Sequence, residues 1–139
     1  MSQNVEVSLL LREGKTVEAL KQMPGIPESS FFHTRALEAC YTTPRPAGAD
    51  RLLEQVEKEA MAFHDPEPRF GQAGLFNFCL GNDFTARLAK ASINGGFCAY
   101  DYLQMDPLLA EFRKSPQYSG LLAEAKQCRD RFLAEREKP

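Results

Sequence analysis

The sequence has little of what builds sheets, metal sites or membrane spans. Only eleven of its 139 residues are Val, Ile or Thr, the β-branched types that pack best in a sheet. It has no Trp, two His and four Cys, and so few Cys exclude a disulfide scaffold. No apolar run approaches the roughly 20 residues of a spanning helix, and the first four residues do not resemble a signal peptide. We therefore expect a cytoplasmic protein that does not bind membranes.

The sequence also lacks a large excess of either positive or negative charge. The chain carries 17 Lys and Arg against 19 Asp and Glu, a formal net charge of −2, and its pI is about 5.7. This balance argues against nucleic acid or an anionic membrane as the main partner. At 43% hydrophobic residues the chain is long enough and apolar enough to bury the core of one domain.

What the sequence does have is helix formers in helical spacing. Apolar residues between 116 and 135 recur at intervals of three, four and seven, and form one stripe: Tyr118, Leu121, Leu122, Ala125, Cys128, Phe132 and Leu133. A second stripe runs from Leu52 to Phe63. The pattern predicts an all-α protein with helices at 4–12, 16–23, 29–41, 49–63, 69–80, 84–94, 99–105 running into 107–113, and 116–135.

Breaks between these helices follow from proline, glycine and capping residues. Pro24–Pro27 ends a helix because proline lacks a backbone donor and clashes with the preceding turn. Gly81–Asp83 predicts a tight turn, and Asn94–Gly96 the end of a helix. Asp106–Pro107 and Ser115–Pro116 each pair a capping residue with proline at the first helical position.

A repeat of about 34 residues links the helices in pairs. Gly14, Gly48 and Gly81 lie 34 and 33 residues apart, and each precedes a predicted helix. An alanine follows the first and the last of these glycines by five residues, and Phe70 and Gly74 precede Gly81. This pattern resembles the tetratricopeptide repeat, in which a small residue lets the neighbouring helix approach while an aromatic side chain fills the gap.

The resemblance implies antiparallel helix-turn-helix pairs stacked as a short right-handed solenoid. Residues 1–94 would form three such pairs, and 95–139 would add short helices and a capping helix to the same compact domain. Residues 95–139 look like the C-terminal end of tetratricopeptide regions in bacterial signalling proteins with a Ser/Thr kinase, nucleotide cyclase or winged-helix domain. A regulatory segment with no catalytic part is implied, either excised from a larger protein or free-standing.

The same resemblance implies a concave groove that binds a protein segment or the catalytic domain of the parent protein. Its expected lining is Ser8, Arg35, Gln72, Leu75 and Phe78. The last three are not cationic, so we expect an apolar or mixed ligand and not an acidic chain end. The alternative for helix 69–80 is burial between two neighbours, as in the inner helices of solenoids.

A second functional hypothesis is a small-molecule sensor. Residues 95–113 are rich in aromatic side chains, and a pocket between them and the preceding helices would be lined by Phe97, Tyr100, Tyr102 and Phe112. An open apolar groove would favour protein binding, and a deep enclosed aromatic pocket would favour sensing.

Residue types that carry chemistry show no motif. The cysteines are spaced 39, 19 and 30 residues apart and the two histidines 31 apart, which predicts no metal site. We expect free, buried cysteines, with Cys98 the most exposed. Gly14–Thr16 matches the end of a phosphate-binding loop but lacks the upstream glycine. The sequence thus predicts a protein that is not an enzyme and needs no cofactor.

Overall fold

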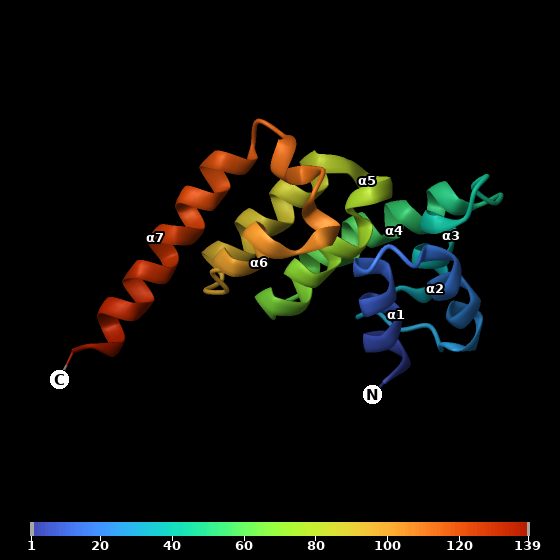
Figure 1. The fold of residues 1–139 in the computed structure, drawn as a ribbon, viewed down its shortest axis with the longest axis horizontal. Helices are drawn as coiled ribbons and strands as arrows, with labels where there is room; N and C mark the ends of the chain where they lie inside the picture. Colours follow the sequence, from blue (N-terminus) through green and yellow to red (C-terminus); the bar gives the residue numbers. More distant parts are fainter. Residues whose placement is uncertain (1, 139) are drawn as a thin grey trace.

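The computed structural model describes residues 2–138 and is all-helical, with no strand in that range (Figure 1). The α-helices are α1 (Gln3–Arg12), α2 (Thr16–Gln22), α3 (Thr34–Tyr41), α4 (Ala49–Ala62), α5 (Pro66–Asn94), α6 (Tyr100–Met105) and α7 (Tyr118–Arg136). Short 3-10 helices are η1 (Met23–Gly25), η2 (Pro107–Leu109) and η3 (Phe112–Lys114). The all-α prediction is confirmed, and most helix ends lie within two or three residues of those expected.

Helices packed in pairs form the first two thirds of the chain. Helix α1 packs on α2, and α3 on α4. The two halves of α5 fold back on each other. Arg69 Nη1 donates to the carbonyl oxygen of Ala91 at 3.3 Å, and Thr85 Oγ1 lies 3.4 Å from the carbonyl oxygen of Ala73. The predicted turn between helices 69–80 and 84–94 is therefore confirmed, although the first half begins earlier, at Pro66.

Gly81 makes the bend in α5. Its φ of 88° lies in the left-handed region, where a side chain would be strained. The bend releases backbone carbonyls from the helical ladder. Thr85 Oγ1 donates to Gly81 O at 3.2 Å, and Asn77 Nδ2 donates to Thr85 Oγ1 at 2.6 Å. These two buried side chains therefore link the two halves of α5 across the bend.

The predicted helix 29–41 is too long by five residues. Helix α3 begins at Thr34, after His33, whose φ of 51° is left-handed and whose backbone N–H donates to Ser29 O at 2.7 Å. The turn lets Phe32 enter the core while Phe31 stacks on Phe63, with the ring centroids 5.5 Å apart. Tertiary contacts of these rings override a helical pattern that the sequence alone favours.

Two hydrophobic clusters meet along α5. The first gathers α1–α4 and residues from both halves of α5, such as Phe76 and Phe84, around fully buried side chains such as Met23 and Leu37. The second gathers other residues from both halves of α5, such as Phe70 and Ile93, with α6, η2, η3 and α7 around Leu103 and Phe112. Helix α5 is thus the shared wall of both clusters, and Figure 1 shows it in the middle of the molecule.

Each cluster is closed by a disulfide, which corrects the expectation of free cysteines. Cys40 of α3 is bonded to Cys79 of α5, with Cα atoms 5.6 Å apart, and Cys98 is bonded to Cys128 of α7, with Cα atoms 5.4 Å apart. No free cysteine remains within residues 2–138. The pairs are 39 and 30 residues apart in sequence. Spacings this long carry no local signal, so the pairing becomes visible only in the fold.

Helix α7 covers the second cluster with only its first half. Leu121, Ala125 and Cys128 are buried, whereas Phe132 and Leu133 are 58% and 43% exposed. Figure 1 shows the end of α7 projecting away from the other helices, so the apolar stripe continues after the core has ended. The helix begins at Tyr118 and not at Pro116, and Ser115 does not cap it.

Gly74 of α5 lies close to the short helix η2, so the predicted close approach of a neighbouring helix at this residue is confirmed. A Cβ at Gly74 would lie 3.4 Å from Asp106 Oδ2 and 3.7 Å from Leu108 Cβ. The larger side chain in Gly74→Leu would push directly on both residues. We expect the substitution to lower the free energy of unfolding by about 1–3 kcal/mol through overpacking, measured by urea denaturation followed by circular dichroism.

Gly71, one turn earlier in the same helix, is the matched control. A Cβ there meets no atom within 4 Å, so Gly71→Leu should leave stability unchanged or raise it through better helix propensity. Equal effects of the two substitutions would show that the contact at Gly74 does not limit packing.

Candidate functional site

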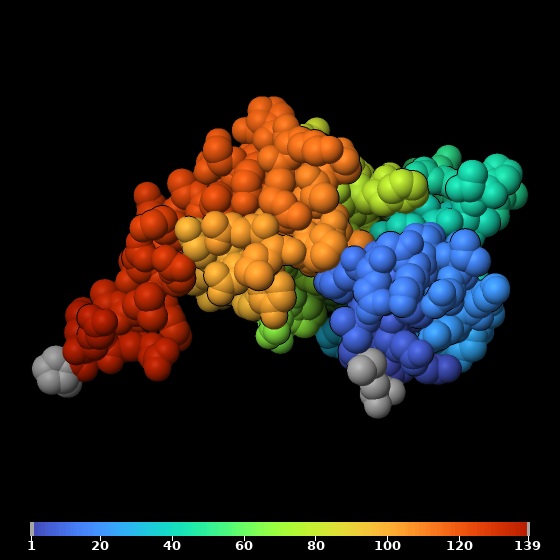
Figure 2. All heavy atoms as spheres, viewed as in Figure 1, coloured from blue at the N-terminus to red at the C-terminus, as the bar shows by residue number. Residues whose placement is uncertain are grey.

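An apolar groove separates α1 from α6. Its walls are side chains that a folded domain would normally bury: Val5 and Leu9 of α1 are 49% and 41% exposed, and Tyr102 and Met105 of α6 are 52% and 75% exposed. On the face shown in Figure 2, α1 (blue) and the segment that contains α6 (gold to orange) lie on either side of the green beginning of α5. We call this feature the α1/α6 groove.

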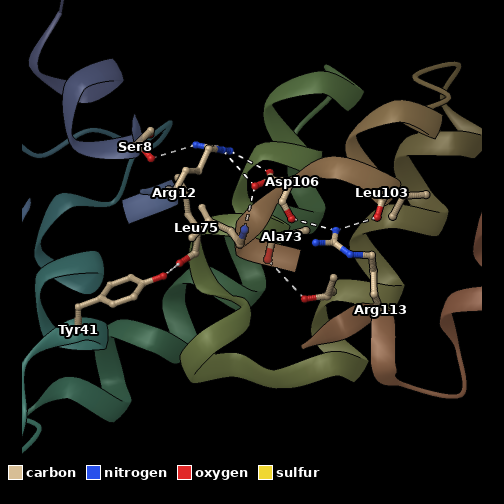
Figure 3. A network of polar contacts seen from close by, with 10 residues as sticks. Ser8, Arg12, Tyr41, Ala73, Leu75, Leu103, Asp106 and Arg113 are labelled. Carbon is tan, nitrogen blue, oxygen red and sulfur yellow. Dashed lines mark hydrogen bonds and ion pairs between the residues drawn. The ribbon is translucent and has the colours of Figure 1, made fainter. Parts of the chain in front are cut away.

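A buried ion pair forms the floor of the α1/α6 groove. Arg12, at the end of α1, donates from Nε and Nη2 to the two carboxylate oxygens of Asp106, each at 3.1 Å (Figure 3). The Asp106 side chain is 4% exposed and that of Arg12 is 29% exposed. This two-point geometry fixes the guanidinium plane and neutralises both charges. The pair also links two helices that are 94 residues apart in sequence.

Backbone groups hold Asp106 in place. Its Oδ1 accepts from the N–H of Leu108 at 2.9 Å and so caps η2, as the Asp-Pro pattern predicts. Arg113 donates to the carbonyl oxygens of Asp106 and Leu103 at 2.9 Å and 3.1 Å (Figure 3). Both carboxylate oxygens and the backbone carbonyl oxygen of Asp106 are thus hydrogen-bonded, which holds the floor of the groove in one position.

Tyr41 of α3 is hydrogen-bonded to the backbone of α5 near the same region. Its hydroxyl donates to the carbonyl oxygen of Leu75 at 2.9 Å, and burial raises the pKa of Tyr41 to about 12 (Figure 3). The phenol is therefore neutral at physiological pH and acts as a hydrogen-bond donor within the scaffold. It does not serve as an acid or base.

Three neighbouring hollows make up the α1/α6 groove, and all of them are lined by Arg12 and Tyr102. One of about 290 Å³ lies along α1 toward Phe32, and one of about 420 Å³ lies beside Met105 and Pro107. The third, of about 130 Å³, is lined by aromatic side chains.

The aromatic hollow combines three rings with acidic side chains. Phe70, Phe97 and Tyr102 lie with their ring centroids 5.7 Å, 5.9 Å and 6.1 Å apart. Glu67 of α5 lines the same hollow, and Asp101 lines the hollow beside it. Neither carboxylate has an ion-pair partner within residues 2–138. Since Arg12 and Asp106 cancel each other, the uncompensated charge of the groove is negative.

The structure brings together only some of the residues expected to form an aromatic pocket. Phe97 and Tyr102 share the aromatic hollow, with Phe70 as a third ring. Phe112 lies elsewhere, fully buried in the second cluster. Tyr100 faces α7, where the guanidinium of Arg129 stacks over its ring at 4.2 Å from the centroid. Arg129 is therefore packed against Tyr100, although 39% of its side chain remains exposed.

The expected partner groove is not formed as the tetratricopeptide resemblance implies. Gln72 and Leu75 are 2% and 6% exposed, so the buried-helix alternative is correct for them and they cannot contact a partner. Phe78 is exposed but stacks on Tyr41, and Arg35 donates to backbone carbonyls of Met23 and Ile26. The remaining residue lies at the α1/α6 groove: Ser8 lines the hollow along α1.

A second cavity, of about 530 Å³, lies between α4 and the turn before α3. His33 Nε2 donates to Glu59 Oε2 at 2.6 Å, and Gln55 Nε2 donates to Glu59 Oε1 at 2.9 Å. These hydrogen bonds, that of Gln55 first, lower the pKa of the Glu59 carboxyl. Ser29 and Ser30 also line the cavity.

A histidine held by a carboxylate resembles a general base, but this geometry does not present a reactive nitrogen. Nε2 is occupied by Glu59, and Nδ1 is buried without a hydrogen-bond partner among the described residues. A general base must reach the proton that it removes. The pair instead ties the left-handed residue His33 to α4. Within residues 2–138, no group of three or more His, Cys, Asp or Glu side chains is placed to hold a metal ion.

Sequence reasoning missed the residues that matter most in the α1/α6 groove. Asp106 is visible as a capping residue, but nothing in the pattern pairs it with Arg12 across 94 residues. The exposure of the groove walls was equally difficult to predict, because Val5, Leu9 and Met105 continue apolar patterns that predict burial. The only local signal is the aromatic content of 95–113.

Comparisons with known proteins leave the family open. No family model, no curated protein and no solved structure matches the chain. Among the helices of residues 2–138, none has both the length and the hydrophobicity needed to cross a bilayer.

Proposed function

We propose that the protein is a non-catalytic interaction module whose α1/α6 groove binds an amphipathic helical segment of a partner protein. The observation that carries this proposal is the pair of exposed apolar walls, Val5 and Leu9 opposite Tyr102 and Met105, over a neutralised and fixed ion pair. Apolar side chains gathered in this way gain free energy when a partner removes them from water. An apolar helix face laid into a groove is a common way to do so.

The charge of the α1/α6 groove indicates which charged residues the partner segment carries beside its apolar face. Glu67 and Asp101 line the groove without ion-pair partners within residues 2–138. An acidic chain end would meet like charge there, and Arg12 is already paired with Asp106. The partner segment is therefore apolar and cationic, in keeping with the expectation of a mixed ligand.

The size of the aromatic hollow favours a protein segment over a small-molecule sensor. Its volume of about 130 Å³ is smaller than the roughly 300–1,000 Å³ of a typical ligand pocket. It has room for the end of one side chain, while the longer groove around it has room for the rest of a segment.

The tetratricopeptide architecture and a role in signalling form part of the same proposal. The three helix pairs and their turn glycines support a solenoid of this type. The two disulfides favour an oxidising compartment over the cytoplasm expected from the sequence, because disulfides persist mainly in oxidising compartments.

Selection from a displayed peptide library tests the groove. Immobilised protein is expected to enrich peptides with apolar residues at i, i+3, i+4 and i+7 together with Lys or Arg. Leu9→Glu and Met105→Glu should each weaken their binding at least about tenfold, because each buries a charge against the apolar face. Affinities are measured by fluorescence anisotropy.

Phe132→Glu is the matched control. Phe132 is as exposed as the wall residues but lies at the far end of α7, so its replacement should leave peptide affinity unchanged. The proposal is wrong if the selected peptides bind Leu9→Glu and Met105→Glu as tightly as the parent, or if Phe132→Glu alone abolishes binding.

A further inference from the structure

The aromatic hollow at one end of the α1/α6 groove has a composition that the binding of an apolar helix does not require. Phe70, Phe97 and Tyr102 come from α5, the loop before α6, and α6 itself, and all three rings lie within 6.1 Å of one another. Glu67, one turn before Phe70, lines the same hollow. Aromatic rings beside a carboxylate are the surroundings that stabilise an organic cation, because ring faces carry negative quadrupole charge.

Within residues 2–138, no cationic side chain lies over these rings. The two cation–π contacts within residues 2–138 are Arg129 with Tyr100 and Arg136 with Phe132, and neither involves the hollow. Arg12 lines the hollow, but its guanidinium donates to Asp106 and to Ser8 O. The Arg129–Tyr100 contact shows that a cation stacks on an aromatic ring elsewhere in this fold.

We propose that the aromatic hollow binds an alkylammonium group, the side-chain end of a lysine or N-methyl-lysine in the partner segment. This inference rests on the proposed function, since it names the residue that the groove selects. The volume of about 130 Å³ holds only a few heavy atoms, given that a water molecule takes about 30 Å³ in the liquid. An anion is excluded, because Glu67 repels it and Asp106 already neutralises Arg12.

Phe70 and Tyr102 have different positions in the aromatic hollow. Phe70 is 5% exposed and forms its base, whereas Tyr102 is 52% exposed and can close over a bound group. Glu67 is exposed at the rim and has no ion-pair partner within residues 2–138, so it can approach the ammonium without losing another contact. Removal of the rim charge should weaken binding and leave the fold intact.

Titration of the full chain with choline, followed by NMR, tests whether the aromatic hollow recognises the positive charge of a ligand. The comparison ligand is 3,3-dimethylbutan-1-ol, which has the same shape as choline with carbon in place of the charged nitrogen. We expect choline to shift the amide signals of Gly71 and Tyr102 with a Kd on the order of millimolar, and the alcohol to bind at least about tenfold more weakly.

Two variants and one control show whether choline binds through Glu67 and Tyr102. Glu67→Gln removes the charge, and Tyr102→Leu keeps apolar bulk but removes the ring, so each should weaken choline binding about fivefold. Glu54→Gln, an exposed carboxylate of α4 outside the hollow, should leave it unchanged. Unchanged spectra of the remaining residues establish that each variant is folded.

The outcomes separate this inference from the proposed function. Equal affinities for choline and the alcohol, or no shift with choline at about 50 mM, overturn the cation site while library peptides can still bind the groove. Choline binding that survives in Tyr102→Leu and Glu67→Gln also overturns it. Loss of peptide binding in Met105→Glu with choline binding retained leaves both proposals standing.

Discussion

Reduction of the two disulfides is expected to lower the melting temperature by at least about 10 °C, and each bond should contribute independently to that loss. Cys40–Cys79 closes a loop within the first cluster and Cys98–Cys128 a loop within the second, so neither bond can replace the other. Loops of this length contribute about 2–5 kcal/mol each by limiting the unfolded chain. Thermal denaturation followed by circular dichroism, with and without reductant, measures the loss.

Paired variants show whether both bonds exist and act locally. Intact mass should rise by roughly 4 Da on full reduction, since each broken bond takes up two hydrogens. Cys40→Ser/Cys79→Ser and Cys98→Ser/Cys128→Ser should each give part of the loss, and the two losses should add, because the bonds lie in separate clusters. An oxidised protein that reacts with four equivalents of a thiol reagent in its native state would contradict the pairing.

Local features of the fold were predictable because they depend on local physics. Helical spacing, proline and the turn glycine determine α1, α2, α4 and both halves of α5, and Gly81 adopts the positive φ that its place in a turn implies. Asp106 caps the next helix as its Asp-Pro sequence predicts. Each of these outcomes involves residues at most a few positions apart.

Features that depend on distant contacts were not predictable. The turn at Ser29–His33 exists because Phe32 packs in the core and His33 bonds to Glu59, 26 residues away. The disulfides and the Arg12–Asp106 pair join segments at even greater separations. A helical pattern is only a weak preference in such places, and tertiary contacts decide.

The candidate site illustrates the same limit. Phe97 and Tyr102 were accessible to sequence reasoning because aromatic residues are dense around them. Gln72 and Leu75 were placed on the wrong surface, because a helix packed on two sides has no solvent face and its pattern cannot show which neighbour covers it. The walls of the α1/α6 groove became visible only once exposed apolar residues could be distinguished from buried ones.

Arg12→Met is expected to destabilise the protein by about 2–4 kcal/mol, although a methionine retains most of the apolar stem. The substitution leaves the Asp106 carboxylate, 4% exposed, without its cation in the space between α1 and η2. The cost of such an unpaired charge is normally about 3–5 kcal/mol, and the 29% exposure of Arg12 reduces it because water can reach that side of the pair. Urea denaturation measures the change.

A double-mutant cycle separates pairing from the other contacts of each residue. Asp106→Asn keeps an acceptor for the N–H of Leu108 but loses the charge, so its cost should be smaller than that of Arg12→Met. The double variant should be more stable than the sum of the two losses predicts, by about 1–3 kcal/mol, because no buried charge is then left alone. Independent, additive losses would show that the two side chains do not interact in solution.

Lys126→Met is a control that removes an ion pair with a short N–O distance but without burial. Lys126 and Asp130 lie closer together, at 2.8 Å, but both side chains are about half exposed on the surface of α7. Water and salt screen such a pair, so its loss should not change stability measurably. If Arg12→Met and Lys126→Met had the same effect, burial of Asp106 would not be the cause. A large effect of Arg12→Met alone, unchanged in 1 M salt, would establish that the floor of the α1/α6 groove is held by a buried charge pair.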